Sequence, residues 1–280
     1  MKEENILNYP KEYGASLEVR RNYYDLAVII PFYNAERFLK RAIQSVLEQK
    51  SGKAVLILVD DGSADHSPAI AKEIARDRDD ILIVTQVNKG VAAARNAGIE
   101  VAIKAGAKYI GFLDSDDAWL KGAFIGIESA IQSNKDVYEF SYYVANEDLS
   151  RGRFVAAKEI QIDGTINRWG VSFWAYIYKA EVINRYSIKF PEGVKANEDE
   201  AFRYLYLCVS NTGERFDLPI LAYRSNPASV TRRKGSDLLN KYKNVIDAWN
   251  YIEKELDRLQ REHKLIAQEK SDENGALSHP

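Results

Sequence analysis

The sequence predicts an α/β fold, with a mainly parallel central sheet, helices on both of its faces and a long C-terminal helix. From Leu26 onward, apolar runs rich in β-formers alternate with helical patterns, which is the order of elements in βαβ units. The runs are apolar along their whole length, as expected for parallel strands that helices cover on both sides.

The first half of the chain supplies four of the predicted strands, at residues 26–32, 54–59, 81–86 and 109–113. A helix over residues 36–49 is predicted because it gathers its apolar residues on one face: Phe38, Leu39, Ala42, Ile43, Val46 and Leu47. Asp65 or Ser67 can cap the second helix, with Pro68 in its first turn. Gly106 ends the third, which begins at Val91.

After Gly122 the alternation loosens. Residues 137–145 and 153–162 are predicted strands of a different sheet or an edge hairpin. Residues 173–178 and 215–223 are strand-like, and 198–209 is a predicted helix. We divide the chain into an N-terminal arm (1–25), two halves of the fold (26–122 and 123–231), a C-terminal helical extension (236–270) and a disordered tail (271–280).

The C-terminal helix carries an apolar seam with steps of three and four residues: Tyr242, Val245, Trp249, Ile252, Leu256, Leu259 and Ile266. A seam of this kind packs either on the helix's own domain or on another copy or partner. Both alternatives stay open from the sequence, and the second makes a homodimer through this helix an expectation.

Composition excludes several classes of protein. A formal net charge of -2 lacks the basic excess of a nucleic-acid binder. Met1 to Asp25 lacks the apolar core of a signal peptide, and no run reaches the roughly 18 apolar residues that span a bilayer. The single cysteine, Cys208, is expected to be buried and reduced. We therefore expect a cytoplasmic protein, with membrane contact at most peripheral and from the inner face.

Two acidic clusters follow predicted strands, Asp60-Asp61 before Gly62 and Asp114-Ser115-Asp116. Ligands of parallel sheets bind outside the carboxyl ends of the strands, so both clusters should open onto one crevice. Carboxylates two residues apart suit Mg²⁺ or Mn²⁺. The alternatives are a helix N-cap for the second cluster, since Ala118-Trp119-Leu120 begins a helical pattern, and a tight turn for the first.

A third segment, from Asn88 to Gly98, combines a loop with the small-residue start of a helix. There Lys89 and Arg95 could serve a phosphate near the helix N-terminus. The chain has neither a P-loop motif nor a dinucleotide fingerprint.

Taken in order, these segments resemble family 2 glycosyltransferases of the GT-A nucleotide-diphospho-sugar transferase fold. Residues 27–34 resemble the opening strand and Pro-x-Tyr-Asn turn of the family, and 59–63 match its Asp-Asp-Gly-Ser motif. Residues 88–98 match its Asn-x-Gly…Ala-Arg-Asn-x-Gly segment, and 114–116 its Asp-x-Asp metal motif. The resemblance covers Leu26 to about Thr231.

The resemblance implies roles for the donor half, 26–122. Asp60 and Asp61 would hold the base and ribose, and Pro31 and Tyr33 would line the nucleotide pocket. Asn88, Gly90 and Arg95 would shape the nucleotide side of the cleft, with Ser115 beside them. Asp114 would support the ribose or metal, and Asp116 would ligate the Mn²⁺ or Mg²⁺. The donor implied is a nucleotide diphosphate sugar, with UDP the expected nucleotide.

The second half, 123–231, would bind the acceptor, a glycan or glycoconjugate. Residues 193–202 resemble the Glu-Asp-x-x-Phe element of the family. By that match Asp199 is the general base, Glu198 its orienting neighbour, and the anomeric centre is inverted by direct attack. Glu200 is the rival base, and a plain helix cap is the alternative for all three acids.

One position departs from the pattern of the family. The segment from Tyr223 to Thr231 places Asn226 where members often carry a histidine near the diphosphate. An amide oxygen can reach a hard cation, so Asn226 stays a candidate metal ligand, and Arg224 a candidate phosphate contact. Trp174 is the candidate acceptor-stacking residue, with core packing as its alternative. The processive Gln-x-x-Arg-Trp element is missing, which favours single-sugar transfer.

Two other functions compete with sugar transfer. A nucleotidyltransferase would need a Gly-rich N-terminal loop, which the sequence lacks. A non-catalytic nucleotide- or glycan-binding module derived from this fold would have lost the metal aspartates or the base. All of these acids are present, so the sequence favours the enzyme.

Overall fold

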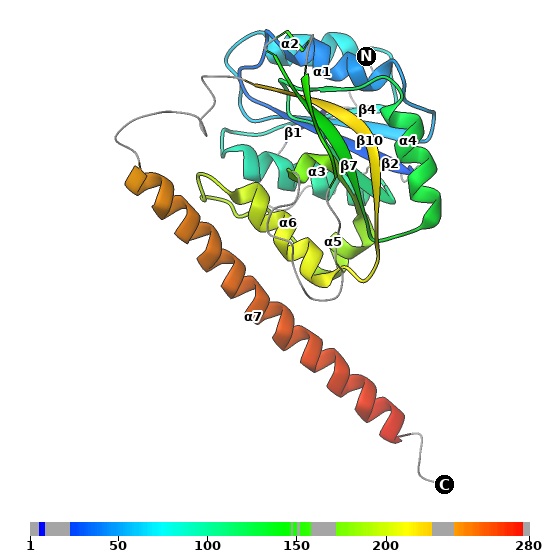
Figure 1. The fold of residues 1–280 in the computed structure, drawn as a ribbon, viewed down its shortest axis with the longest axis vertical. Coiled ribbons are helices and arrows are strands. Elements are labelled where there is room, and N and C mark those ends of the chain that lie inside the picture. Colours follow the sequence, from blue (N-terminus) through cyan, green and yellow to red (C-terminus); the bar gives the residue numbers. More distant parts are fainter. Residues whose placement is uncertain are drawn as a thin grey trace.

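A computed structural model describes residues 6–8, 23–146, 148–149, 152–157, 172–225 and 238–276, with the side chains of the last range described for 242–262. Its centre is one ten-stranded mixed sheet, surrounded by helices, from which the long last helix extends (Figure 1). The predicted α/β fold is confirmed.

The strands agree closely with the apolar runs of the sequence. They are β1 (Ile6–Asn8), β2 (Leu26–Phe32), β3 (Ala54–Asp60), β4 (Ile81–Thr85), β5 (Tyr109–Phe112), β6 (Ala118–Trp119), β7 (Val137–Ala145), β8 (Gly152–Val155), β9 (Tyr176–Lys179) and β10 (Gly213–Arg224). Every residue of β2, β3 and β5 is buried, which explains their unbroken apolar sequence.

The helices complete the alternation. They are α1 (Leu39–Leu47), α2 (Ser67–Ala75), α3 (Val91–Lys104), α4 (Ala123–Ala130), α5 (Ala180–Tyr186), α6 (Glu198–Val209) and α7 (Leu238–Ala276), with short 3-10 turns η2 (Ile131–Ser133) and η3 (Phe173–Ala175). The buried residues of α1 are Leu39, Ala42, Ile43 and Val46, which confirms the predicted apolar face.

The order of strands explains where the helices lie. The sheet runs β1-β4-β3-β2-β5-β9-β7-β10-β6, with β8 paired to β7. Passing from β2 to β3 to β4 moves in one direction across the sheet, and passing from β4 to β5 reverses it. Right-handed crossovers therefore place α1 and α2 on one face and α3 on the other, where α3 contacts α5 and α5 contacts α6.

Four local predictions need correction. The pair Ala118–Trp119 is strand β6, antiparallel to β10. The Trp119 amide donates to Ser45 Oγ at 3.0 Å, and helix α4 begins only at Ala123, after Gly122 adopts a left-handed φ of 90°. Strand β7 belongs to the main sheet rather than a different one, and it pairs antiparallel with β8 as the hairpin alternative predicted, although β7 is not an edge strand. Residues 173–178 divide into η3 and β9. Cys208 of α6 is exposed rather than buried.

The termini also differ from expectation. Part of the N-terminal arm forms β1, which adds a parallel edge strand to β4. At the other end α7 continues to Ala276, past residue 270, where the helical extension was predicted to end. Once nucleated, a helix gains one hydrogen bond per added residue, and no proline interrupts this stretch.

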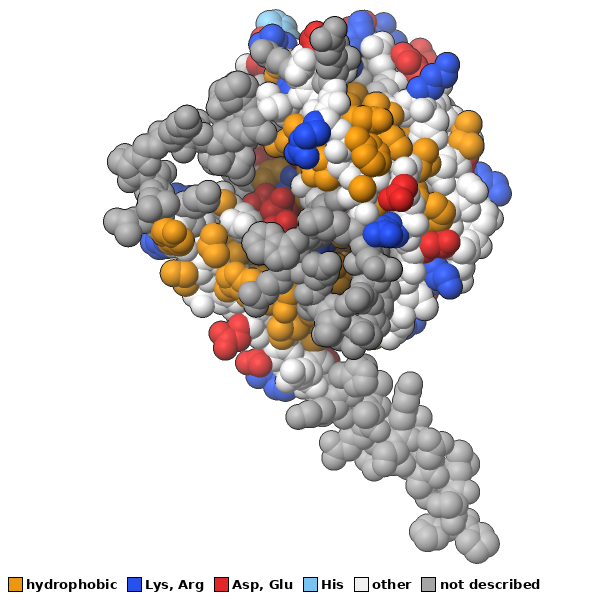
Figure 2. All heavy atoms as spheres, in the orientation of Figure 1, with side chains coloured by type: hydrophobic (Ala, Val, Ile, Leu, Met, Phe, Trp, Pro, Cys, Tyr) orange, Lys and Arg blue, Asp and Glu red, His pale blue; other side chains and the backbone are white. Residues whose placement is uncertain are grey.

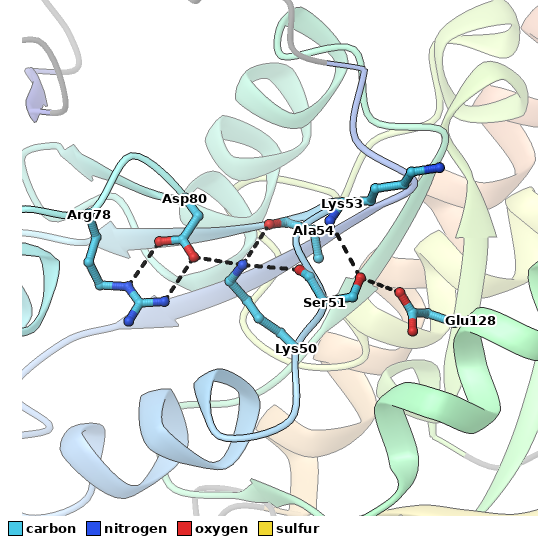
Figure 3. Close-up of polar contacts among 7 residues, drawn as sticks. All are labelled: Lys50, Ser51, Lys53, Ala54, Arg78, Asp80 and Glu128. Carbon is cyan, nitrogen blue, oxygen red and sulfur yellow. Dashed lines mark hydrogen bonds and ion pairs between the residues drawn. The ribbon is translucent and has the colours of Figure 1, made fainter.

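A polar network fixes the amino-terminal edge of the sheet, away from the candidate site (Figure 3). Lys50 Nζ lies 2.7 Å from Asp80 Oδ2, and its side chain is only 5% exposed. Arg78 pairs with the same carboxylate at 2.8 Å. Ser51 Oγ donates to Glu128 of α4. The network thus ties the end of α1 to the starts of β3 and β4 and to α4.

Candidate active site

Three neighbouring parallel strands, β3, β2 and β5, end at one edge of the sheet. Phe32 at the end of β2 pairs with Asp60 at the end of β3, and Leu113 donates its amide to Ile29 O at 3.0 Å. The loops that follow these strands therefore start side by side, as ligand-binding loops of parallel sheets do. Acidic side chains lie in a hollow on one face of the molecule (Figure 2).

Asp61 organises the loop that contains Asn88. Its carboxylate is buried and accepts three hydrogen bonds, from Gln86 Nε2 at 2.7 Å and the amides of Lys89 and Gly90 at 2.9 and 2.8 Å. Both oxygens are thus engaged within the protein. The carboxylate holds the loop in place, and Gln86 is a partner that the sequence analysis missed.

Gly62 lets this loop approach closely. Its φ is +76°, and a Cβ there would lie 2.8 Å from the amide nitrogen of Asn88. Backbone cannot move aside as a flexible side chain can, so a larger residue would displace the Asn88 loop. The neighbouring Asp60 is buried and accepts the amide of Ser63 at 2.9 Å.

The loop after β2 is fastened to the loop after β3. Asn34 donates its amide to Ser63 Oγ at 3.0 Å and accepts the amide of Ala64 on Oδ1 at 2.8 Å. Pro31 is buried and Tyr33 is 50% exposed. A cavity of about 530 Å³ is lined by residues 34–38 with Ala64 and Asp65. Neither the Asp60-Asp61 pair nor Asp114 and Asp116 are among its lining residues.

Arg95 joins two acidic motifs that lie far apart in the sequence, at Asp114 and at Glu198. From α3, Nη2 contacts Asp114 Oδ1 at 2.9 Å and Nη1 contacts Glu198 Oε1 at 3.0 Å. The arginine is 4% exposed, and its guanidinium lies over the ring of Phe173, 4.3 Å from the centroid. The structure therefore brings the end of β5 and the start of α6 to one buried cation.

The charged groups around Arg95 shift one another's pKa values. Burial lowers the pKa of Arg95, but the carboxylates of Asp114, Glu198 and Asp199 outweigh this and raise it overall. Burial raises the pKa of Glu198, and the adjacent Asp199 adds to this rise while Arg95 opposes it. Arg95 is thus the counter-charge that allows acids to gather in a buried place.

Asp116 and Asp117 follow Asp114 in the same loop, where the Asp117 amide donates to Asp114 O at 3.0 Å. Burial raises the pKa of Asp116, and the like charge of Asp114 raises it further. Asp117 is 1% exposed and accepts the amide of Arg224 at 2.7 Å. Arg224 Nε donates to Asp116 O at 2.7 Å, and its guanidinium lies 3.7 Å from the ring centroid of Phe38.

The rival base is already occupied. Glu200 forms an ion pair with Arg203, which is 4% exposed in the same helix. Asp199 lies between Glu198 and Glu200 in the first turn of α6 and accepts the amide of Glu200 at 2.8 Å. Of the three acids of this turn, Glu198 and Glu200 thus each pair with an arginine, which distinguishes Asp199.

The acidic residues suit a divalent cation. Asp114 and Asp116 offer hard oxygen ligands. Burial and, after it, the like charge of Asp114 raise the pKa of Asp116, and a cation would offset both. Within the described residues no group of three or more His, Cys, Asp or Glu side chains could hold a metal by itself. The remaining ligands would come from substrate oxygens or from residues outside those ranges, where the candidate Asn226 lies.

Most of the predicted site residues lie at the carboxyl ends of these strands or in the first turn of α6. Two of them, Arg95 and Trp174, lie in surroundings that differ from the prediction. Arg95 is buried among carboxylates and rings instead of being open to a phosphate. Trp174 is 4% exposed, stacks on Tyr223 at 5.2 Å and meets Tyr142 edge-on at 4.7 Å. These are the contacts of a core residue, so we leave Trp174 out of the acceptor site proposed below.

Asn96 is the positioning residue that the sequence analysis did not single out. Its amide group accepts the Phe190 amide on Oδ1 at 2.9 Å and donates to Phe190 O at 2.9 Å. The same nitrogen contacts Glu192 at 3.0 Å. Its place next to Arg95 in the sequence was visible, but only the fold reveals that this pair holds the segment leading into α6.

Comparison with known proteins identifies the family of the chain. The family model described as glycosyl transferase family 2 matches residues 27–187. The chain is 30% identical over 220 residues to the uncharacterized glycosyltransferase EpsJ of Bacillus subtilis, covering 74% of this chain and 62% of that protein. It is 25% identical over 218 residues to an Escherichia coli protein, covering 77% of this chain and 83% of the relative. That relative is the UDP-Glc:alpha-D-GlcNAc-diphosphoundecaprenol beta-1,3-glucosyltransferase WfgD.

Among solved structures, TarS 1-349 of S. aureus superposes with a TM-score of 0.65 at 21% identity, covering 82% of this chain and 65% of that one. TarS has also been solved with UDP and with UDP-GlcNAc. The chain thus spans less than two thirds of EpsJ and of this TarS fragment, and the likeness to TarS shows the GT-A fold.

The described helices include none that is both long enough and apolar enough to cross a membrane.

Proposed function

The chain belongs to glycosyl transferase family 2, and from this premise we propose that it is an inverting, metal-dependent glycosyltransferase. It transfers one sugar from a nucleotide diphosphate sugar to a hydroxyl of a glycan or glycoconjugate. The observation that carries the proposal is the pairing of Arg95 with both Asp114 and Glu198. This pairing puts the acids after β5 within reach of those that begin α6.

The donor occupies the edge formed by β2, β3 and the 86–90 loop. Asp60 receives the base or ribose beside Pro31 and the exposed ring of Tyr33. Asp61 acts by holding Asn88 and Gly90 in position. UDP is the proposed nucleotide, supported by the UDP-bound TarS structures and by the UDP-Glc in the name of WfgD.

The residues that would hold the cation are Asp114 and Asp116, with Ser115 between them and Asn226 as the further candidate. Bound there, Mn²⁺ or Mg²⁺ would draw negative charge onto the leaving diphosphate. Arg224, whose Nε is fixed on Asp116 O, adds a positive charge beside the same acids.

Asp199 is the proposed general base. Its carboxylate takes the proton of the acceptor hydroxyl as the oxygen attacks the anomeric carbon from the face opposite the diphosphate. The new glycosidic bond forms as the bond to the diphosphate breaks, so the anomeric centre inverts. Glu198, fixed by Arg95, orients the acceptor or the base.

The acceptor half begins at α4 and includes β7, β9 and α6. A lipid-linked or polymeric glycan is the proposed acceptor class, on the analogy of the WfgD name. Peripheral contact with a membrane that carries such an acceptor remains part of the proposal. Nucleic acid is not proposed as a partner, given the net charge of -2.

We further propose that α7 pairs with a second copy of the chain. Ala248, Ile252 and Leu259 are buried against the body, while Tyr242 and Ile246 are 59% and 57% exposed. One apolar stripe therefore docks the helix and a second is open to a partner.

The test is turnover of a panel of nucleotide sugars with Mn²⁺, with and without chelator, beside Asp116→Ala and Asp199→Ala. We expect one donor to be turned over, and activity to be lost with chelator and in both variants. A wild type that binds no nucleotide diphosphate in the presence of metal would refute the enzyme. The non-catalytic binding module would then take its place.

A further inference from the structure

Arg95 has a role that donor binding does not explain. We propose that it is a positioning residue, which holds the Asp114 carboxylate and the Glu198 carboxylate at a fixed separation and thereby sets where the base stands relative to the donor. This inference rests on the proposed function, since it concerns the same two sets of acids.

The surroundings of Arg95 argue against direct contact with the donor. Its side chain is 5% exposed, and its guanidinium lies 4.3 Å from the ring centroid of Phe173 and 5.3 Å from that of Phe190. The rings restrict the plane of the guanidinium, and its two Nη atoms point to different carboxylates. A planar group with two engaged arms acts as a spacer of fixed length, which a flexible ammonium cannot reproduce.

The next residue of α3 reinforces the same connection. Asn96 clamps the backbone of Phe190 with two hydrogen bonds of 2.9 Å. From there the chain reaches α6 through Asn197, whose φ of 66° turns the backbone sharply into the helix. The position of the first turn of α6 is therefore set by α3 at two consecutive residues, Arg95 and Asn96.

The charge of Arg95 is as necessary as its shape. Glu198 has a side-chain exposure of 13%, and Asp114 one of 27%. Without the guanidinium, Glu198 would lose its ion-pair partner, and its largely buried carboxylate would turn away from Asp114. That turn would move Glu198 and its neighbour Asp199.

Steady-state kinetics separates positioning from donor contact. The variants are Arg95→Gln, which removes the charge, and Arg95→Lys, which keeps one charge but cannot bridge two carboxylates. We expect kcat to fall about 100-fold in Arg95→Gln and less in Arg95→Lys, because small misplacements of reacting groups cost that much. The dissociation constant of UDP should stay within about threefold of wild type, since the donor is not touched.

Arg203→Gln is the matched control. Arg203 is also a buried arginine, 4% exposed, paired with Glu200 in the same helix, but it has no link to Asp114. We expect kcat at saturation to stay within about threefold of wild type at a temperature where the variant is folded. An Arg95→Gln protein that keeps kcat but binds UDP at least about tenfold more weakly would overturn the inference in favour of direct donor contact.

Amide hydrogen exchange tests the same inference without activity. Arg95→Gln should speed exchange in two segments far apart in sequence, 113–117 and 190–199, whereas Arg203→Gln should affect only α6 and its neighbours. Faster exchange in one of the two segments alone would overturn the inference. A wild type that turns over no donor would refute the proposed function, and exchange would still decide the role of Arg95.

Discussion

At the scale of single residues, the site depends on groups whose work is internal. Both carboxylate oxygens of Asp61 accept hydrogen bonds from the 86–90 loop, one of them from the side chain of Gln86. Position 62 requires glycine because its φ is left-handed and a Cβ there would lie too close to the amide nitrogen of Asn88. Asp61, Gln86 and Gly62 thus hold the 86–90 loop in place from inside the protein, so that a ligand of this loop need not contact them.

Gly62→Ala tests this directly. The substitution places a Cβ 2.8 Å from the Asn88 amide nitrogen at a φ of +76°, so it adds strain of about 1–2 kcal/mol and displaces the donor loop. We expect a lower melting temperature and UDP binding at least about tenfold weaker, measured by calorimetry. Gly52→Ala is the control, because nothing lies within 4 Å of its Cβ. Equal UDP affinity in both variants would refute the role of Gly62.

Sequence reasoning reached the motifs but not their connections. The apolar runs identified β2, β3 and β5, and the acids at their ends fell on one edge as expected. The pairing of Arg95 with Glu198 joins residues 103 positions apart, and no local pattern encodes which charges meet across such a distance. Trp174 was a candidate for contact with the acceptor, but it packs in the core. The sequence does not show on which side of a sheet an aromatic residue will pack.

At the scale of elements, the ion pairs of Lys50 and Arg78 with Asp80 hold the amino-terminal ends of β3 and β4. The candidate site lies at the opposite, carboxyl ends of the strands. Burial tends to raise the pKa of Asp80, but hydrogen bonds from Arg78 and Lys50 outweigh this and lower it. A carboxylate whose pKa is lowered by folding stabilises the folded state at pH values above the ordinary aspartate pKa. This stabilisation is lost as the pH falls through the lowered pKa. Lys50, 5% exposed in its side chain, has no other acidic partner among the described ion pairs.

Asp80→Asn should therefore lower the free energy of unfolding by about 3 kcal/mol at pH 7, because it leaves the buried Lys50 charge without its carboxylate. The difference from wild type should shrink as the pH falls below the ordinary aspartate value, since the wild type then loses the same charge. Urea unfolding between pH 3 and 7 measures both effects. Asp79→Asn, at the exposed neighbouring position, should change little at any pH, and an equal loss in both variants would contradict the account.

The element α7 divides its apolar residues between two surfaces. Trp249 packs edge-on against Tyr204 at 5.5 Å and is still 40% exposed. Arg258 donates to Tyr186 O at 2.8 Å, which fixes the helix to the end of α5. The heptad seam predicted from the sequence thus packs on its own domain at Ile252 and Leu259, while Tyr242 at its start and Ile246, which lies outside the seam, stay exposed.

Ile246→Lys should disrupt the proposed pairing of two chains while leaving the fold intact, because Ile246 is 57% exposed. We expect dimer in the wild type and at least about tenfold weaker association in the variant, measured by sedimentation at several concentrations. Lys254→Ala, another exposed position of α7, should associate like wild type. A wild type that sediments as a monomer throughout would refute the proposal.

At the scale of the whole molecule, the fold brings the proposed donor site and the proposed base together from different parts of the chain. The parallel strands β2, β3 and β5 present one set of acids, and α6, reached through β9 and α5, presents the other. The right-handed crossover of α3 puts Arg95 between them. The family match over residues 27–187 ends before α6, so Asp199 is the part of the account that most needs a direct test.

The most direct measurement is proton NMR of the first sugar anomer released or transferred from an α-linked nucleotide sugar, beside Asp199→Asn. The account predicts that the β anomer appears first, and that Asp199→Asn lowers the rate by about 10² to 10⁴. An α anomer appearing first, or an Asp199→Asn protein as fast as wild type, would contradict the assignment of Asp199 as the base of an inverting transfer.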